Sequence, residues 1–173
     1  MKTTNFFRKM LSAMAAILFV LTATAEERNI TVTAGGELAS AYGGDALATV
    51  TSLTLSGPLN GDDITLLRTL ATDHELTVLN LSAAVITGEG SFKYGSSSYA
   101  IRANTVRANM LSPLPKLQKL TLPTSLTTIE DYAFSYNEVL TTLISPALLT
   151  SCGYYAFIRS PPSSMGSSAT TRL

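Results

Sequence analysis

Few residues of the types that carry catalysis or hold a metal are present in this sequence. It has one histidine, His74, and one cysteine, Cys152. A zinc site needs three or four such ligands, and a serine hydrolase of the strand–turn–helix type needs a Gly-x-Ser-x-Gly motif, which the sequence lacks. We therefore predict no enzyme, no metal site and no cofactor. We interpret His74 as a solvated residue at the end of a helix, where the helix dipole favours it.

One cluster of oxygen-bearing side chains remains, formed by Asn60, Asp62 and Asp63. Calcium prefers clustered oxygen ligands, so a calcium loop is one interpretation, although the other positions of an EF-hand are absent. The alternative is a helix N-terminus, because Asn caps helices and acidic residues in the first turn interact favourably with the helix dipole. We favour helix capping, since apolar residues at helical spacing follow directly at 64–71.

The composition indicates a folded chain with a removable leader. Of the 173 residues 46% are hydrophobic and 14% are charged, which is unlike a disordered protein. Three basic residues precede an apolar run at 10–21, and Ala23-Thr24-Ala25 forms a small-x-small cleavage site. This arrangement predicts a signal peptide over residues 1–25, cleaved after Ala25, and hence a protein that is secreted or lies at the cell surface.

The charge of the remaining chain excludes one class of partner. Three of the twelve Lys and Arg residues lie in the leader, whereas all twelve Asp and Glu residues follow it, which leaves a net charge of about three negative. A protein without excess basic charge lacks the electrostatic footprint of nucleic-acid binding. No second apolar stretch of about eighteen residues is present, so no membrane span is expected in the mature chain.

An internal repeat of 23 residues organises the second half of the sequence. Residues 117–134 and 140–157 carry the same landmarks in the same order. The matched pairs are Leu117/Leu140, Leu120/Leu143, Pro123/Pro146, Leu126/Leu149, Ile129/Cys152, Tyr132/Tyr155, Ala133/Ala156 and Phe134/Phe157. Such a unit cannot bury its own apolar residues, so units must stack on one another. Cys152 takes the place of Ile129, which indicates a buried small hydrophobe; a reactive thiol is the alternative.

Four segments follow the pattern apolar-x-x-Leu-x-apolar, and they start at Val50, Leu76, Leu117 and Leu140. The one exception is Ser145, which stands at the last apolar position of the fourth segment. Alternation in a strand directs the leucines of each pair into a core and the residues between them outward. The outward residues are predicted to form a concave face that could bind a partner: Ser52, Thr54, Val78, Asn80, Lys119, Thr121, Thr142 and Ile144. Only Lys119 is charged, so recognition there would depend on shape and hydrogen bonds. An inert surface is the alternative.

The remaining segments are assigned from composition and patterning. We expect an N-terminal cap at 26–50, with a first strand at 30–33 and a short helix at 38–42. Repeat units would occupy 51–158. A disordered tail rich in Ser and Pro is expected at 159–173.

A Gly- and Ser-rich insertion at about 83–105 interrupts the period. It contains three aromatic residues that periodicity cannot place, namely Phe92, Tyr94 and Tyr99. Exposed aromatic residues are enriched at binding hot spots, so these residues could contact a partner. The alternative, which we favour, is a local hydrophobic flap over the edge of the stack.

The late pattern, Leu120-Thr-Leu-Pro-x-Ser-Leu-Thr-x-Ile129 followed by Tyr132-Ala-Phe134, resembles the leucine-rich repeats of BspA-type surface proteins of Bacteroidetes. The resemblance covers residues 28–158. It implies a short, strand-rich leucine-rich repeat solenoid of mixed β/α character with an N-terminal cap. The chain departs from the family pattern in having only two full late repeats, and no C-terminal cap is expected because the period is lost after Ile158. It also implies an exported, non-enzymatic binding or adhesion module whose partner would be a protein or a glycan.

The last unit raises one further expectation. The period is lost after Ile158, which favours the alternative that the chain is an N-terminal structural fragment of a longer repeat protein, truncated after the second full unit. The side of the last unit that carries Leu143, Leu149 and Phe157 would then be open. An open stack edge favours self-association.

Overall fold

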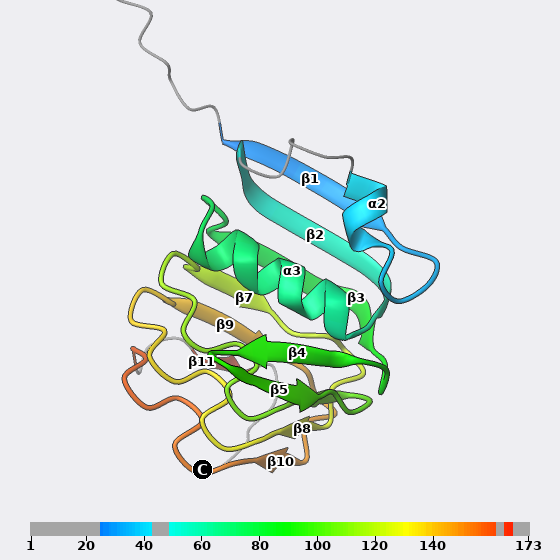
Figure 1. Cartoon of the computed structure of the whole chain (residues 1–173). Coiled ribbons are helices and arrows are strands. Elements are labelled where there is room, and N and C mark those ends of the chain that lie inside the picture. Colours follow the sequence, from blue (N-terminus) through cyan, green and yellow to red (C-terminus); the bar gives the residue numbers. More distant parts are fainter. Residues whose placement is uncertain (1–24, 43–48, 162–164, 168–173) are drawn as a thin grey trace, which may run out of the picture.

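A six-stranded parallel sheet forms one side of the molecule in a computed structural model, which describes residues 25–42, 49–161 and 165–167 (Figure 1). The signal-peptide prediction lies outside the described residues except for Ala25. The strands of this first sheet, in spatial order, are β1 (Glu26–Thr31), β2 (Val50–Leu59), β3 (Val78–Ile86), β7 (Lys119–Thr121), β9 (Thr142–Ser145) and β11 (Met165–Ser167). Parallel pairing of consecutive units is the arrangement of a solenoid, so the predicted fold class is confirmed.

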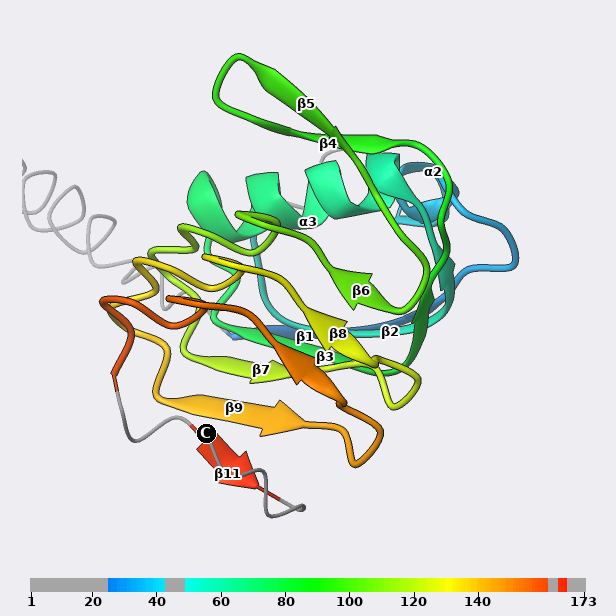
Figure 2. The same ribbon diagram turned by 90° about the horizontal axis from the view of Figure 1, so that it is seen from below.

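A second parallel sheet of three short strands faces the first (Figure 2). It consists of β6 (Thr105–Val106), β8 (Thr128–Ile129) and β10 (Ser151–Cys152), in the order β10-β8-β6. Each late unit runs from a strand of the first sheet through a turn to a strand of the second sheet, and then returns. The apolar residues of the repeat fill the space between the two sheets.

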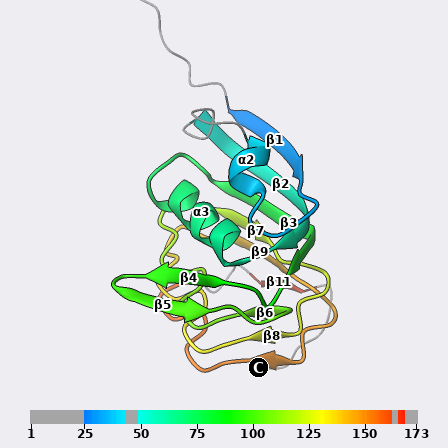
Figure 3. The same cartoon turned by 45° about the vertical axis from the view of Figure 1, so that its right-hand side comes forward.

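Helix α3 (Gly61–Thr72) connects β2 to β3 and takes the place that the second sheet occupies in later units (Figure 3). Its inward residues Ile64, Leu67 and Leu70 are each at most 1% exposed, as their helical spacing predicted. The short helix α2 (Leu38–Tyr42) lies where it was expected. The first strand was expected at 30–33, but β1 begins four residues earlier and pairs with β2 along its length.

One row of leucines crosses the first sheet from unit to unit. Leu53, Leu79, Leu120 and Leu143 pair in register and are at most 1% exposed. The predicted inward phasing of the strands is therefore correct. Farther along the repeat, the rings of Phe134 and Phe157 stack with their centroids 5.2 Å apart. Both contacts join residues that periodicity had already matched.

Polar side chains in the turns satisfy the backbone of the preceding unit. Asn137 accepts a hydrogen bond from the backbone N–H of Leu114 at 2.7 Å and donates one to the carbonyl of Leu111 at 2.7 Å. One repeat later, Ser160 accepts from the N–H of Asn137 at 3.3 Å and donates to the carbonyl of Phe134 at 2.8 Å. Buried backbone groups outside regular strands need such partners, so these side chains hold the turns together.

The insertion predicted at about 83–105 is shorter in the structure, because residues at both ends of this range belong to strands of the two sheets. Residues 83–86 belong to β3 and pair with β2, with Ala84 and Ile86 buried. At the other end, Thr105 belongs to β6. The interruption contains an antiparallel hairpin, β4 (Ser91–Tyr94) and β5 (Ser97–Ala100), which lies against α3 (Figure 3).

The prediction of a disordered tail at 159–173 is also wrong for the described residues of this segment, 159–161 and 165–167. Ser160 continues the polar ladder, and β11 pairs with β9 as a further strand of the first sheet. Met165 pairs with Leu143, an interval of 22 residues rather than 23. The comparison at a strict period of 23 therefore missed the strand, and Leu143, expected to be open, is 1% exposed. Residues 162–164 and 168–173 lie outside the described part of the chain.

Candidate binding face of the first sheet

The structure places all eight predicted outward residues on one face of the first sheet, in two rows. Strand register aligns Ser52, Val78, Lys119 and Thr142 in the first row. It aligns Thr54, Asn80, Thr121 and Ile144 in the second. All eight are half-buried or exposed, whereas the leucines between them are buried. We call these two rows the open face. Figure 2 shows α3 and the second sheet on the opposite side of the first sheet.

The chemistry of the open face is that of neutral hydrogen-bonding groups beside β-branched carbons. Four of its eight side chains carry a hydroxyl group. The amide oxygen of Asn80 accepts from the N–H of Ser82 at 3.0 Å, which fixes the side chain and directs its NH₂ group away from that contact. Lys119 is exposed and brings the only charge of the eight. The face therefore offers neutral hydrogen-bonding groups and apolar carbons rather than charge.

Two further residues extend the rows into β1, and the sequence-based prediction missed them. Glu27 pairs with Ser52, and Asn29 pairs with Thr54, so they continue the first and second rows. Both are exposed. They were missed because the first strand was expected to start only at residue 30. The alternation of Ile30 and Val32 with polar neighbours could have extended that strand backward.

A shallow pocket of about 350 Å³ adjoins the second row where β7 and β9 end. Its lining residues are Ser82, Thr121, Leu122, Thr124, Ile144, Ser145, Pro146, Ala147 and Leu148. Ile144 is 38% exposed and Leu148 is 59% exposed, so the pocket presents apolar side chains to solvent. Thr121 and Ile144 belong to the open face as well, which makes the pocket continuous with it. Leu148 lies in a turn, where strand patterning could not identify it.

The aromatic residues of the hairpin fasten it to helix α3. Phe92 is fully buried and stacks on Tyr99, with ring centroids 5.5 Å apart. The guanidinium of Arg68 lies 6.0 Å from the Phe92 ring centre and 5.5 Å from that of Tyr94. Arg68 also donates to the carbonyl of Met110 at 2.7 Å, and burial lowers its pKa. Phe92 is thus unavailable to a partner, and the flap interpretation accounts for these contacts.

Asn60 and Asp63 form a capping box at the start of α3. The side-chain oxygen of Asn60 accepts from the N–H groups of Asp62 and Asp63 at 2.9 and 3.3 Å. The carboxylate of Asp63, 2% exposed, accepts from the N–H of Asn60 at 2.9 Å, Gly36 at 2.7 Å and Leu38 at 3.0 Å. The capping interpretation is therefore confirmed. Asp63 additionally ties the start of α2 to α3, a role that sequence spacing did not suggest.

The one histidine and the one cysteine of the sequence, His74 and Cys152, lie in different elements of the fold. His74 follows the end of α3, as predicted, but it is half-buried rather than fully solvated. Cys152 packs against the core and is half-buried, and burial raises the pKa of its thiol. Within the described residues, no group of three or more His, Cys, Asp and Glu side chains could hold a metal ion.

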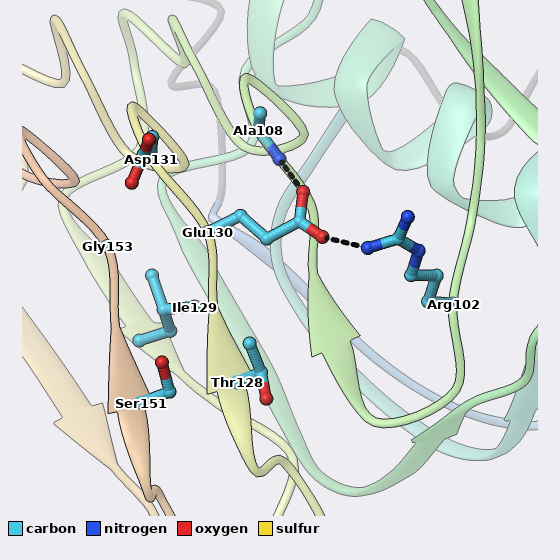
Figure 4. A pocket seen from close by; sticks show the side chains of 8 residues that line it. All are labelled: Arg102, Ala108, Thr128, Ile129, Glu130, Asp131, Ser151 and Gly153. Carbon is cyan, nitrogen blue, oxygen red and sulfur yellow. Dashed lines mark hydrogen bonds and ion pairs between the residues drawn. The ribbon is translucent and has the colours of Figure 1, made fainter.

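A second pocket, of about 360 Å³, lies over the second sheet (Figure 4). Glu130 accepts from Arg102 Nη1 at 3.0 Å, from Arg107 Nε at 2.8 Å and from the backbone N–H of Ala108 at 3.1 Å. The neighbouring Asp131 accepts from the N–H of Tyr154 at 2.7 Å. Both carboxylates are thus occupied by groups of the protein itself, and their contacts join neighbouring units.

Comparison with known proteins agrees with this architecture. The model of the BspA type leucine rich repeat region matches residues 78–167, where it finds six copies of the repeat. The matched range begins with β3 and ends with β11, which includes the strand that a strict period had missed. No curated protein matches the chain. Among the described residues, no helix is both long and apolar enough to cross a membrane. Because the match covers more than half of its residues, the chain belongs to the family of proteins with BspA-type leucine-rich repeats.

Proposed function

We propose that the protein is an exported, non-enzymatic binding or adhesion module that recognises a protein or glycan through the open face. The observation that supports it most directly is the register of the first sheet, which aligns eight outward side chains in two rows across four strands. Parallel repeat sheets form extended surfaces of this kind, and leucine-rich repeats typically mediate binding.

The composition of the open face indicates how it would bind. Lys119 and Glu27 are opposite charges in the same row, so the face has no strong field to attract a highly charged ligand. The adjoining pocket supplies exposed apolar carbons at Ile144 and Leu148. A partner that fits would place an apolar group in the pocket and form neutral hydrogen bonds along the rows. Such recognition is weakly dependent on salt.

A binding screen with matched variants tests the proposal. The exported protein, fluorescently labelled, is applied to a glycan array and to an array of extracellular proteins. Thr121→Arg places a long cation in the middle of the second row and beside the pocket, and it should weaken binding to an authentic partner by about tenfold or more. Ser96→Arg, on the exposed turn of the hairpin, is the control and should leave binding unchanged. Absence of any partner, or equal binding by the two variants, contradicts the proposal.

Export itself is a separate part of the proposal, and it depends on the small residues at Ala23 and Ala25. N-terminal sequencing of protein recovered outside the cytoplasm should begin at Glu26. An intact Met1 on exported protein contradicts cleavage.

A further inference from the structure

The pocket beside the open face lies close to the one cation among the eight outward residues. Lys119 of β7 is exposed, and Thr121, two residues later on the same strand, lines the pocket. Alternate residues of a strand point to the same side of a sheet, so both side chains project from the open face. At about 3.3 Å per residue, their backbone positions are about 6.6 Å apart. The face thus offers a charged contact and an apolar contact at one fixed spacing.

The charge of Lys119 is not balanced by its neighbours in the first row. Val78 and Thr142, which pair with Lys119 on either side, are uncharged. Glu27, the opposite charge of this row, lies three strands away, which is about 14 Å at a strand spacing of about 4.8 Å. That distance exceeds the screening length of about 8 Å at physiological salt, so Glu27 offsets little of the charge at Lys119. Charge complementarity at this position favours a single acidic group of a partner.

The lining of the pocket favours an aliphatic group. Five of its nine lining residues are aliphatic, namely Leu122, Ile144, Pro146, Ala147 and Leu148. Ile144 and Leu148 are 38% and 59% exposed, so a partner can remove their carbon atoms from water. The pocket volume of about 350 Å³ is at the lower end of the range of about 300–1,000 Å³ that small-molecule sites occupy. A shallow pocket of this size suits one aliphatic side chain of a partner.

A sugar suits this pocket less well than a protein side chain does. A sugar carries hydroxyl groups around its ring, and those that face the aliphatic lining would lose their hydrogen bonds to water without replacement. The hydroxyl of Thr124 in the lining already donates to the carbonyl of Ser82 at 3.0 Å. An aliphatic side chain carries no polar group that needs a partner there. The observations therefore favour a segment of a protein as the occupant.

An extended segment matches the spacing of the two contacts. In an extended chain the side chains of residues i and i+2 lie on one side, about 6.6 Å apart, which is also the interval from Lys119 to Thr121. A short segment can adopt this form directly, whereas a short isolated helix is marginally stable in water. The residue between the two would point away from the sheet, so its type should matter little.

We propose that the open face binds an extended protein segment in which one residue separates an acidic residue from an aliphatic residue. The acidic residue pairs with Lys119, and the aliphatic residue enters the pocket beside Ile144 and Leu148. The segment can run in either direction along β7, so either order of the two residues satisfies the proposal. This inference rests on the proposed function, because it names the class of partner for the same face.

An array of synthetic peptides tests the inference on the labelled protein recovered after export of the full chain. Each peptide consists of Gly and Ser around two variable positions that are separated by one residue, and all pairs of residue types are present. The protein should prefer Asp or Glu at one position by about threefold over alanine, because exposed ion pairs are weak. It should prefer Leu, Ile, Val or Met at the other position by about tenfold, because burial of an aliphatic side chain contributes more.

Three variants assign the two preferences to their residues. Lys119→Glu should change the preference from acidic to basic residues and leave the aliphatic preference as it is. Leu148→Ser should remove the aliphatic preference and leave the acidic one, and Leu148 is exposed enough for the fold to tolerate the change. Lys93→Glu makes the same change of charge at an exposed position of the hairpin, so it is the matched control and should alter neither preference.

The outcomes distinguish this inference from the proposed function. An array without the expected pair of preferences overturns the inference, and so does an acidic preference that Lys119→Glu leaves unchanged. If the protein instead binds a glycan and Thr121→Arg weakens that binding, the inference fails while the open face remains the binding site. If Thr121→Arg leaves all binding unchanged, both proposals fail.

Discussion

Replacing Leu120 by alanine is the sharpest test of the strand phasing. Leu120 is fully buried in the middle of the leucine row, between Leu79 of β3 and Leu143 of β9. Alanine removes three carbon atoms, and at about 0.8 kcal/mol for each buried methylene the loss of transfer free energy is about 2.4 kcal/mol. Both neighbours are held in register by backbone pairing, so the site cannot collapse and a cavity remains. The free energy of unfolding should fall by about 3–5 kcal/mol.

Thr121 is the control for this change, because it is the next residue of β7 and points to the open face. Thr121→Ala should lower the free energy of unfolding by less than about 0.5 kcal/mol. Urea unfolding followed by circular dichroism gives both values, and the dependence on urea should stay the same if only the native contact is lost. Equal losses at the two positions would refute the assignment of inward and outward residues.

Three other outcomes follow from single contacts. Asp63→Ala leaves three N–H donors without their acceptor, of which that of Leu38 is buried, and should lower the free energy of unfolding by about 1–3 kcal/mol, measured by urea unfolding. Cys152 should react with iodoacetamide at least about tenfold more slowly in the native protein than in denaturant, because burial limits access and raises the pKa of the thiol, so that the rate increases only at higher pH than for an exposed thiol; rapid native labelling would contradict this. Hydrogen bonds from Thr33 and Ala34 hold the pKa of Glu37 below its ordinary value of 4.5, so its contribution is present above that value and is lost as pH falls through the folded-state pKa. The stability difference between wild type and Glu37→Gln should accordingly shrink in acid, and a difference that grows there would contradict the assignment.

The repeat and its core could be predicted from the sequence because they depend on identical contacts at a fixed interval. Leu120 and Leu143, or Phe134 and Phe157, are buried against one another for the same reason in each unit. A buried repeat position needs an apolar residue in every unit, so the pattern can be recognised from the sequence. The two rows of the open face follow from the same alternation.

The features that the sequence did not predict depend on contacts between segments that do not repeat one another. Arg68 lies between the hairpin aromatics and the carbonyl of Met110, an arrangement that no spacing rule describes. Asp63 binds the backbone at Gly36, 27 residues away, through a loop without a repeat. The position of β11 was missed because Met165 pairs with Leu143 at an interval of 22 residues, and a fixed period of 23 compares the wrong positions.

The polar ladder of the turns has a consequence for how such a chain can change in length. Asn137 and Ser160 each serve the unit before them, so a unit contains the groups that its predecessor needs. Deleting or duplicating a whole unit joins matching groups at the new junction, whereas removing a few residues leaves several buried carbonyls and N–H groups unmatched. A change by a whole unit should therefore destabilise the fold less than a change of a few residues within these turns, and each added unit extends the first sheet by one strand.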